Sequence, residues 1–477
     1  MATPTVSSVL LHRVFSAGRL ALGLLGAGGL AGANLPGAEL RVGRARVVIT
    51  PPVGSVMGNS YGITVATGVT SNIHAKAVVF ETADGKAALV ACDLISLHTP
   101  IVARARALIA EKTGVPPDRV ILAATHCHAG PQTHPLLFSL AGGAAQKLSE
   151  AYVEKLPGLI AESVRLAEAD LQPAKIFAGS GSEDSISFNR RFLLRDGTVR
   201  MNPGQNPDKV RPMGPIDPQV GVVYIESADG KPLVTVVNFA LHVAVVGGSQ
   251  ISSDYPHTLA ETLGRVKGDA MLTVFLNGMS GNINHVNAYV SSRLRAEAEA
   301  ARIGTILAAA VLKTYPNLRP VEATRLRAVS RSVRVPVLPA PTPSRLAEAR
   351  ATLRRHGKGA TFAEVIRAWR DIDLAQYGAD GTWNSEVQAI VFGRDLALVG
   401  YPGDSFVELG LAMKQNSPFG LTFVSEQSGN GAISYIPNEK AFPEGSYEVD
   451  SARVAPGGGE VLANAAIRLL TELFPRP

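Results

Sequence analysis

The order of apolar and polar positions along the chain predicts an alternation of strands and helices. Short apolar runs bounded by turn residues are typical of buried strands, and longer runs with a period near 3.6 are typical of helices. Strands are expected at 76–81, 87–93, 120–124, 174–177, 221–225, 233–239, 272–277, 328–337, 387–392, 396–399 and 421–424. Helices are expected at 99–113, 149–169, 257–266, 293–315, 344–356, 362–374 and 406–415. The alternation predicts an α/β domain, a layered mixed β-sheet with flanking helices.

Two histidines follow one of the predicted strands closely. His126 and His128 come just after the apolar run 120–124 and before a Gly-Pro breaker. In an extended backbone, residues two apart point the same way, so both imidazoles are expected on one face, with Cys127 pointing away from them. The pair suits a metal site or an acid/base site, and equally a pair of hydrogen-bonded structural histidines.

Further polar side chains follow other predicted strands. His242 comes after 233–239, Asp404 after 396–399, and Tyr435 lies in the loop after 421–424. Ligands at strand ends converge over one edge of a sheet. Two histidines and a carboxylate with an open position are a common arrangement for catalytic zinc, although the separations are long and no H-E-x-x-H motif is present. An active site at strand ends is therefore expected.

Three more residues have two interpretations each. Asp93 ends the strand 87–93 and suits either a partner that orients a histidine or the N-cap of the next helix. Asp404 similarly suits the N-cap of the helix at 406–415. Ser280, between two glycines, suggests a serine nucleophile, but Asn282 occupies the final glycine position of the G-x-S-x-G motif.

Composition limits the class of protein. The 477 residues are 46% apolar and 18% charged, which is typical of a globular chain and not of a disordered one. The net charge is +6, with scattered Lys and Arg and no basic run interleaved with aromatics, so nucleic acid is not an expected partner. Cys92 and Cys127 each lie at the end of an apolar run and are expected to be buried thiols.

The first 40 residues carry a three-part pattern. Arg13 and Arg19 precede a short apolar run, which is followed by small residues ending in Ala31-Gly32-Ala33. This pattern predicts a secretory signal, and hence a secreted or periplasmic protein; a leader without an address, and a cytoplasmic location, is the alternative. The apolar run is too short for a stable membrane span.

Motifs in the remaining chain resemble those of the neutral/alkaline ceramidases. Thr125-His126-Cys127-His128-Ala129-Gly130-Pro131 is similar to the family motif Thr-His-Thr-His-Ser-Gly-Pro. Other matching blocks follow in the family's order: 188–191, 238–242, 253–256, 281–284, 401–404, 430–435 and 447–448. The match spans roughly 46–462. The resemblance implies a zinc amidase that releases a fatty acid from a sphingoid base.

The resemblance also implies roles for individual residues. Those similar to the family's zinc ligands are His126, His242, Asp404 (in place of a glutamate) and Tyr435. Those similar to groups that stabilise the oxyanion or line the pocket are His128, Tyr447 and Arg190. The expected cofactor is one zinc ion (Zn2+), and the expected partner is a small-molecule or lipid N-acyl substrate.

Several positions depart from the family pattern. Asn284 stands where ceramidases have an active-site serine, so it is expected to position substrate and not to act as a nucleophile. Residues 41–477 are expected to form a single catalytic domain with a helical insertion at about 340–380 and no C-terminal Ig-like domain. The substrate stays open: an amide is expected, and the alternatives are a zinc esterase or lactonase, or a secreted non-catalytic lipid-binding protein.

Overall fold

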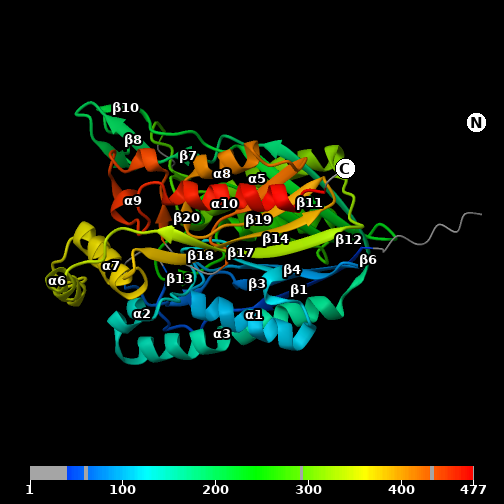
Figure 1. Ribbon diagram of the computed structural model, residues 1–477, viewed down its shortest axis with the longest axis horizontal. Helices are drawn as coiled ribbons and strands as arrows, with labels where there is room; N and C mark the ends of the chain where they lie inside the picture. The colour runs from blue at the N-terminus through cyan, green and yellow to red at the C-terminus, as the bar shows by residue number, and fades with distance from the viewer. Residues whose placement is uncertain (1–39, 59–62, 291–293, 430–433, 476–477) are drawn as a thin grey trace, which may run out of the picture. The chain divides into compact units, whose positions relative to one another are not determined.

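Two β-sheets pack face to face, and helices cover their outer faces (Figure 1). The computed structural model describes residues 40–58, 63–290, 294–429 and 434–475, which belong to one compact unit. The predicted leader, 1–40, lies almost wholly outside the described residues. The expectation of a layered α/β fold with a mixed sheet is confirmed.

The larger sheet is mixed and has the order β14-β12-β11-β6-β1-β3-β4-β5, with the short β16 paired to β6. Its strands are β1 Arg41–Val48, β3 His74–Thr82, β4 Gly85–Cys92, β5 Val120–Ala124, β6 Gln172–Ser182, β11 Gln219–Ser227, β12 Pro232–Phe239, β14 Leu272–Asn277 and β16 Arg319–Pro320. The β4–β5 and β12–β14 pairs are parallel, so a crossover connection joins the two strands of each pair. The chain leaves the carboxyl ends of β5 and β12 into segments that lead to helices.

The smaller sheet has the order β17-β18-β19-β21, with the bounds β17 Leu326–Pro336, β18 Thr382–Phe392, β19 Leu396–Gly400 and β21 Leu421–Ser425. Its inner face packs on the larger sheet through a shared apolar core. In that core the rings of Phe80 and Phe392 meet edge to face, with centroids 5.1 Å apart. The sequence pattern predicted these strands but not their separation into a second sheet.

Helices bury one apolar face each against the outer faces of the sheets. Those on the larger sheet are α1 Thr99–Thr113, α3 Gly143–Ala169, α4 Tyr255–Lys267 and α5 Ala296–Thr314. Those on the smaller sheet are α8 Val407–Gln415 and α10 Gly458–Leu473. Figure 1 shows α1 and α3 together on one side and α8 and α10 together on the other. Among the described residues, no helix combines the length and apolar content that crossing a membrane requires.

The segment expected to be a helical insertion forms two helices, α6 Pro343–Arg354 and α7 Phe362–Tyr377. A capping box starts α7: the Thr361 hydroxyl accepts from the backbone of Glu364, whose carboxylate accepts from the backbone of Thr361. The two helices bury Trp369 and pack against α2 Pro135–Ala141. The insertion is therefore packed against α2 and is not an independent projection.

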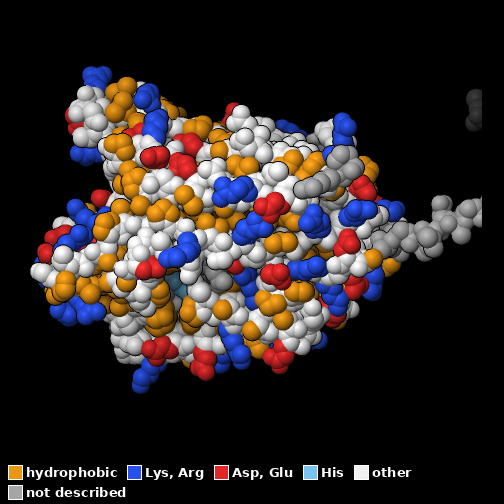
Figure 2. Space-filling model, viewed as in Figure 1, with side chains coloured by type: hydrophobic (Ala, Val, Ile, Leu, Met, Phe, Trp, Pro, Cys, Tyr) orange, Lys and Arg blue, Asp and Glu red, His pale blue; other side chains and the backbone are white. Residues whose placement is uncertain are grey.

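Short elements complete the described chain. The strands are β2 Gly68–Val69, β7 Phe188–Asn189, β8 Arg191–Leu194, β9 Val199–Met201, β10 Lys209–Pro212, β13 Gln250–Ile251, β15 Ile283–Asn284, β20 Asp404–Ser405 and β22 Tyr435–Ile436. The helices are α9 Tyr447–Asp450 and the 3-10 turns Pro117–Arg119, Tyr315–Asn317 and Glu439–Ala441. On the face drawn in Figure 2, basic and acidic side chains are interspersed, as the scattered charges of the sequence suggest.

Neither Asp93 nor Asp404 is the N-cap of the following helix, so the capping alternative is wrong for both residues. The N-cap of α1 is His98, while Asp93 accepts hydrogen bonds from the backbone of His74 and from Lys76 Nζ. The N-cap of α8 is Phe406, which leaves Asp404 in β20. In both cases other buried groups hold the carboxylate before the helix begins.

Candidate metal centre and its cavity

His126 and His128 converge, but not by strand alternation. The strand β5 ends at Ala124, and His126 has a left-handed backbone with φ 65°, a conformation that is rare outside glycine. This turn brings the two Nε2 atoms to 3.2 Å. The two imidazoles do face the same point, as predicted, but this turn and not strand alternation is the cause. Cys127 lies on the other side, where its buried thiol contacts the backbone carbonyl of Ser252.

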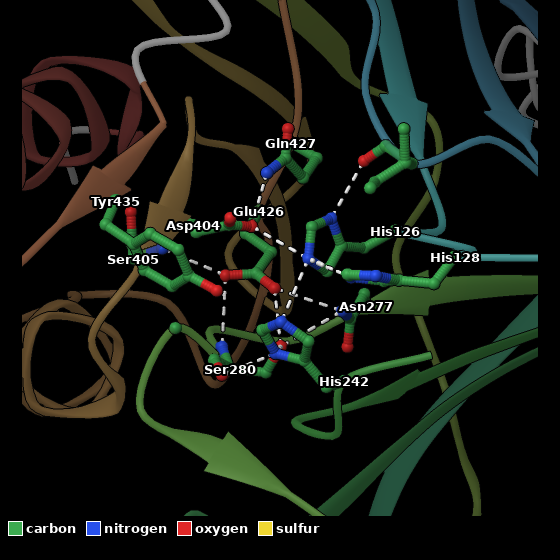
Figure 3. A network of polar contacts seen from close by, with 12 residues as sticks. His126, His128, His242, Asn277, Ser280, Asp404, Ser405, Glu426, Gln427 and Tyr435 are labelled. Atoms are coloured by element: carbon green, nitrogen blue, oxygen red, sulfur yellow. Dashed lines mark hydrogen bonds and ion pairs between the residues drawn. The ribbon is translucent and has the colours of Figure 1, made fainter. Parts of the chain in front are cut away.

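His242 joins this pair from the end of β12. Its Nε2 atom lies 3.0 Å from His126 Nε2, and the three histidines bring their nitrogens within 4.8 Å of one another (Figure 3). His126 and His242 are 3% and 2% exposed. The segments after β5 and β12, strands from opposite ends of the order of the larger sheet, thus place three imidazoles at one buried point.

The outer ring nitrogens anchor these histidines. His126 Nδ1 lies 2.8 Å from the carbonyl of Ile95, and His242 Nδ1 lies 2.9 Å from that of Ser280. Because a carbonyl only accepts, each Nδ1 carries a proton, and Nε2 is the atom of each ring that faces the other imidazole. Burial, and next the charge of His126, lowers the pKa of His242 well below its usual range, which keeps that ring neutral.

Asp404 and Tyr435 reach the same point from the smaller sheet. The two are direct partners in the parallel pair β20–β22. Asp404 Oδ1 lies 3.1 Å from His126 Nε2 and also accepts from the amide of Gln427. Metal-ligating side chains in proteins are held by just such outer hydrogen bonds. The structure therefore brings all four predicted ligands, from distant parts of the chain, to one end of the two sheets.

Arg190 packs beside Tyr435 in a buried ionic network. Its Nη2 atom donates to the Tyr435 hydroxyl at 2.9 Å, and its Nε atom donates to Glu448 at 2.8 Å. The guanidinium lies over the rings of Tyr435 and Tyr447, 5.4 and 5.7 Å from their centroids. Burial raises the pKa of Tyr435 above its usual value, with Arg190 opposing, so the phenol keeps its proton in the ion-free protein.

Asn284 occupies a different place from the other predicted residues. It lies in β15, where its amide donates to Asn202 at 2.9 Å and its carbonyl accepts from the backbone of Val286. Among the described residues that line the cavity beside the histidines, His126, His128, Asp404, Tyr435 and Tyr447 are present and Asn284 is not.

That cavity has an empty volume of about 730 Å³ including its open mouth. Its wall combines the strand-end residues with Trp369 and Asp373 of α7. Both polar and apolar side chains line the wall, so it can accept a molecule with both characters. The helical insertion thus contributes directly to the space next to the candidate metal centre.

Sequence reasoning missed Glu426, which follows β21 and is fully buried. Its carboxylate accepts from the side chains of Ser280 and Asn277, and from the backbones of Ser280 and Ser405. Burial, and next the Asp404 carboxylate, raises the pKa of Glu426 well above its usual range. Glu426 therefore links Ser280, whose carbonyl holds His242, to Ser405, which follows Asp404 (Figure 3). The rule that identified the other strand-end residues would have identified this one.

Comparisons with known proteins agree with the motifs. The chain is 32% identical to the neutral ceramidase of Pseudomonas aeruginosa over 151 residues, which are 31% of this chain and 20% of that protein. Two solved structures share the fold at a TM-score of 0.70 and cover 92% of this chain and 76% of theirs: a ceramidase complexed with C2, 20% identical, and the Pseudomonas aeruginosa neutral ceramidase, 19% identical. No family model matches the chain. Part of the chain is thus similar in sequence to a neutral ceramidase, as its motifs predicted, and the described chain shares the neutral ceramidase fold.

Proposed function

Starting from this relationship, we propose that the protein is a zinc-dependent hydrolase that cleaves the amide bond of an N-acyl substrate. The observation that carries the proposal is the convergence of His126, His242 and Asp404, whose atoms approach to 3.0 and 3.1 Å from three separate segments. Zinc bound by two imidazoles at 2.0–2.1 Å in tetrahedral geometry requires a nitrogen separation of about 3.3 Å. The donor set therefore fits the ion.

We assign the metal to His126, His242, Asp404 and Tyr435, following the resemblance. When bound, zinc supplies Lewis acidity and lowers the pKa of a water molecule to around 7. The two Nδ1–carbonyl hydrogen bonds hold the histidine rings in the ligating orientation before any ion arrives. Arg190 holds the Tyr435 hydroxyl in place and balances the buried charge of Glu448.

The remaining polar groups of the cavity are assigned to the substrate. His128 and Tyr447 line the cavity, and we assign them to donate hydrogen bonds to the oxygen that gains charge when a carbonyl is attacked. We also assign Asp404, whose carboxylate lines the cavity, to accept a proton from the attacking water and return it to the leaving amine. Asn284 is proposed only to support the neighbouring loop, because its contacts are with Asn202 and Val286.

The experiment is hydrolysis of a panel of N-acyl lipids and simple acyl amides, with free amine and free acid both quantified. Wild type is compared with His126→Ala and with His257→Ala, which removes an exposed histidine on α4. We expect amine release by wild type and His257→Ala, and a loss of at least about 1,000-fold for His126→Ala. Ester and lactone substrates of the same acyl chains separate the esterase alternative, and saturable lipid binding without product would favour the binding-protein alternative.

We also propose that the protein is exported. A hydrolase of N-acyl lipids must reach those lipids, and the signal pattern in the first 40 residues is the feature that supports export. N-terminal sequencing of the mature protein from its native host tests this: cleavage near Ala33 agrees with export, and an intact leader on cytosolic protein contradicts it.

A further inference from the structure

Three residues that line the cavity have a left-handed backbone although none of them is glycine. They are His126, Gln427 and Ser434, with φ angles of 65°, 52° and 66°. This conformation is costly for a residue with a Cβ atom and persists only where surrounding contacts enforce it. The left-handed turn of His126 aims its ring at the candidate metal centre. Gln427 is not one of the proposed ligands, so its strained backbone needs another explanation.

The backbone of Gln427 joins the segments that carry two of the proposed ligands. Its carbonyl accepts from the N–H of Ala124 at 3.0 Å, two residues before His126. Its N–H donates to the carbonyl of Gly403 at 3.2 Å, one residue before Asp404. Ala124 ends β5 of the larger sheet, and Asp404 follows β19 of the smaller sheet. Gln427 thus spans the junction between the two sheets beside the candidate metal centre.

The side chain of Gln427 holds the carboxylate of Asp404. Its Nε2 atom donates to Oδ1, the same oxygen that lies 3.1 Å from His126 Nε2 (Figure 3). Gln427 and Asp404 are each 7% exposed, so water competes little for this contact. A carboxylate oxygen has two lone pairs, and a single donor leaves the other lone pair free for a cation. The contact therefore fixes the orientation of Asp404 without using up its capacity to bind a metal.

No other residue type combines this backbone with this contact equally well. Glycine adopts a left-handed backbone without strain but has no amide to offer. Glutamate has the length of glutamine but would place a second carboxylate against Asp404. Methionine has the length but no donor. Gln427 therefore uses a strained backbone to deliver a neutral donor to a buried carboxylate.

We propose that Gln427 is a positioning residue of the candidate metal centre, which holds Asp404 Oδ1 toward His126 before any ion is bound. The inference rests on the proposed function only for the presence of a metal. Because Gln427 acts through Asp404, its loss is expected to weaken metal binding in protein that is otherwise folded. Metal binding needs no turnover, so the inference can hold or fail independently of amide hydrolysis.

The first test removes the donor and keeps the length of the side chain. Gln427→Met retains the left-handed backbone, while Asp404 loses its hydrogen bond. Calorimetric titration of chelator-treated protein with zinc is expected to show about 10- to 100-fold weaker binding than in wild type. Equal zinc affinities for wild type and Gln427→Met overturn the proposal.

Gln132→Met is the matched control for this test. Gln132 is a buried glutamine on the wall of the same cavity, and its amide oxygen accepts from the backbone of Thr133 and His134. Its zinc affinity is expected to stay within about 2-fold of wild type, because it does not contact a proposed ligand. A loss equal to that of Gln427→Met contradicts the proposal, since the effect would then not be specific to the contact with Asp404.

The second test asks whether Gln427 acts through Asp404. In an Asp404→Ala background there is no carboxylate to position, so adding Gln427→Met is expected to change the residual zinc affinity by less than about 2-fold. Competition with a chromophoric chelator measures this weaker binding. A further loss of about 10-fold in this background contradicts the assignment, because Gln427 would then act through another group.

The third test separates the amide from the backbone. Gln427→Ala removes the amide alone, whereas Gln427→Gly removes both the amide and the strain. Both are expected to lose about as much zinc affinity as Gln427→Met, but ion-free Gln427→Gly is expected to unfold at a higher urea concentration than ion-free Gln427→Ala. Wild-type zinc affinity in either variant rejects the role of the amide, and a higher urea midpoint for Gln427→Ala rejects the strained backbone.

Ala296→Gly controls for relief of strain elsewhere in the chain. Ala296 also has a left-handed backbone, with φ 49° at the start of α5, and it is not among the described residues that line the cavity. This variant is expected to unfold at a higher urea concentration than wild type with unchanged zinc affinity. Zinc binding weakened as much as in Gln427→Gly would contradict the proposal, because relief of backbone strain alone would then account for the loss.

Discussion

His126 Nε2 and His242 Nε2 lie 3.0 Å apart although 116 positions separate the two residues in the chain. Each ring is anchored through its other nitrogen to a backbone carbonyl, one after β4 and one in the turn after β14. The rings and their anchors therefore follow two strand pairs, β4–β5 and β12–β14, at the two ends of the strand order of the larger sheet, and the geometry does not depend on a single flexible loop. This preorganisation is what a catalytic metal centre requires.

The substitution Glu426→Gln should weaken metal binding, although Glu426 is not one of the proposed metal ligands. The carboxylate accepts from four donors, so an amide nitrogen in place of either oxygen faces at least one N–H or O–H donor. We expect a loss of about 2–4 kcal/mol in the free energy of unfolding and a 10- to 100-fold weaker metal affinity. Denaturant unfolding and metal titration measure the two. An unchanged metal affinity in folded protein would separate Glu426 from the centre.

Ser280→Ala tests the serine-nucleophile alternative. Ser280 is fully buried, donates to Glu426 at 2.6 Å and is absent from the described residues lining the cavity. A nucleophile must reach the substrate, so we expect the variant to keep activity within about 10-fold of wild type. Steady-state kinetics on the best amide provide the measurement; a loss of several thousand-fold in correctly folded, metal-loaded protein would restore Ser280 as the nucleophile.

Arg190→Lys tests the buried ionic network beside Tyr435. A lysine keeps the charge but cannot donate simultaneously to Tyr435, Glu448 and the carbonyl of Gly281, as the guanidinium does. We expect a loss of about 2–4 kcal/mol in stability and a drop in kcat with little change in KM. Arg195→Lys, on the exposed turn after β8, controls for the substitution itself. Equal behaviour of the two variants would argue against a role for Arg190.

Sequence patterns were sufficient wherever one local signal determined the structure. The helix α1 begins and ends where the pattern placed it, because Pro100 opens it and Gly114 adopts the left-handed C-cap. The polar residues after β5, β12 and β19 were identified because buried strands end abruptly in the sequence. These signals are local, and each requires only a few adjacent residues.

The features that were missed depend on contacts between distant segments. Nothing near Phe392 indicates that its strand belongs to a second sheet packed on Phe80, since both strands have the same apolar pattern. The polar contacts of Asp373 likewise depend on Arg453 and His134, which approach it from other elements. The left-handed backbone of His126 had no signal, because glycine is the residue that usually marks this conformation.

Acidification should lower the free energy of unfolding, and His134 should account for a measurable part of this loss. The folded-state pKa of His134 is about 4, below the usual 6.5, so between pH 6.5 and 4 the unfolded chain binds more protons and stability falls as pH falls. At pH 5 this residue alone accounts for about 2 kcal/mol.

Urea unfolding at pH 7 and pH 5 tests this for wild type and His134→Asn. The difference in unfolding free energy between the two pH values should be smaller in His134→Asn by about that amount. His257→Asn, which removes an exposed histidine, is the control. If the unfolding free energy of His134→Asn changes between pH 7 and pH 5 by as much as that of wild type, the assignment of a buried neutral ring at this position is contradicted.

The most direct test of zinc-dependent amide hydrolysis is to measure activity as a function of the amount of bound zinc. Chelator-treated wild type, confirmed as folded and metal-free by elemental analysis, is titrated with zinc while amine release from an N-acyl substrate is followed. We predict no activity at the start, a linear rise to one equivalent and a plateau, with no rise for His242→Ala. Full amide hydrolysis by the metal-free protein would contradict the account.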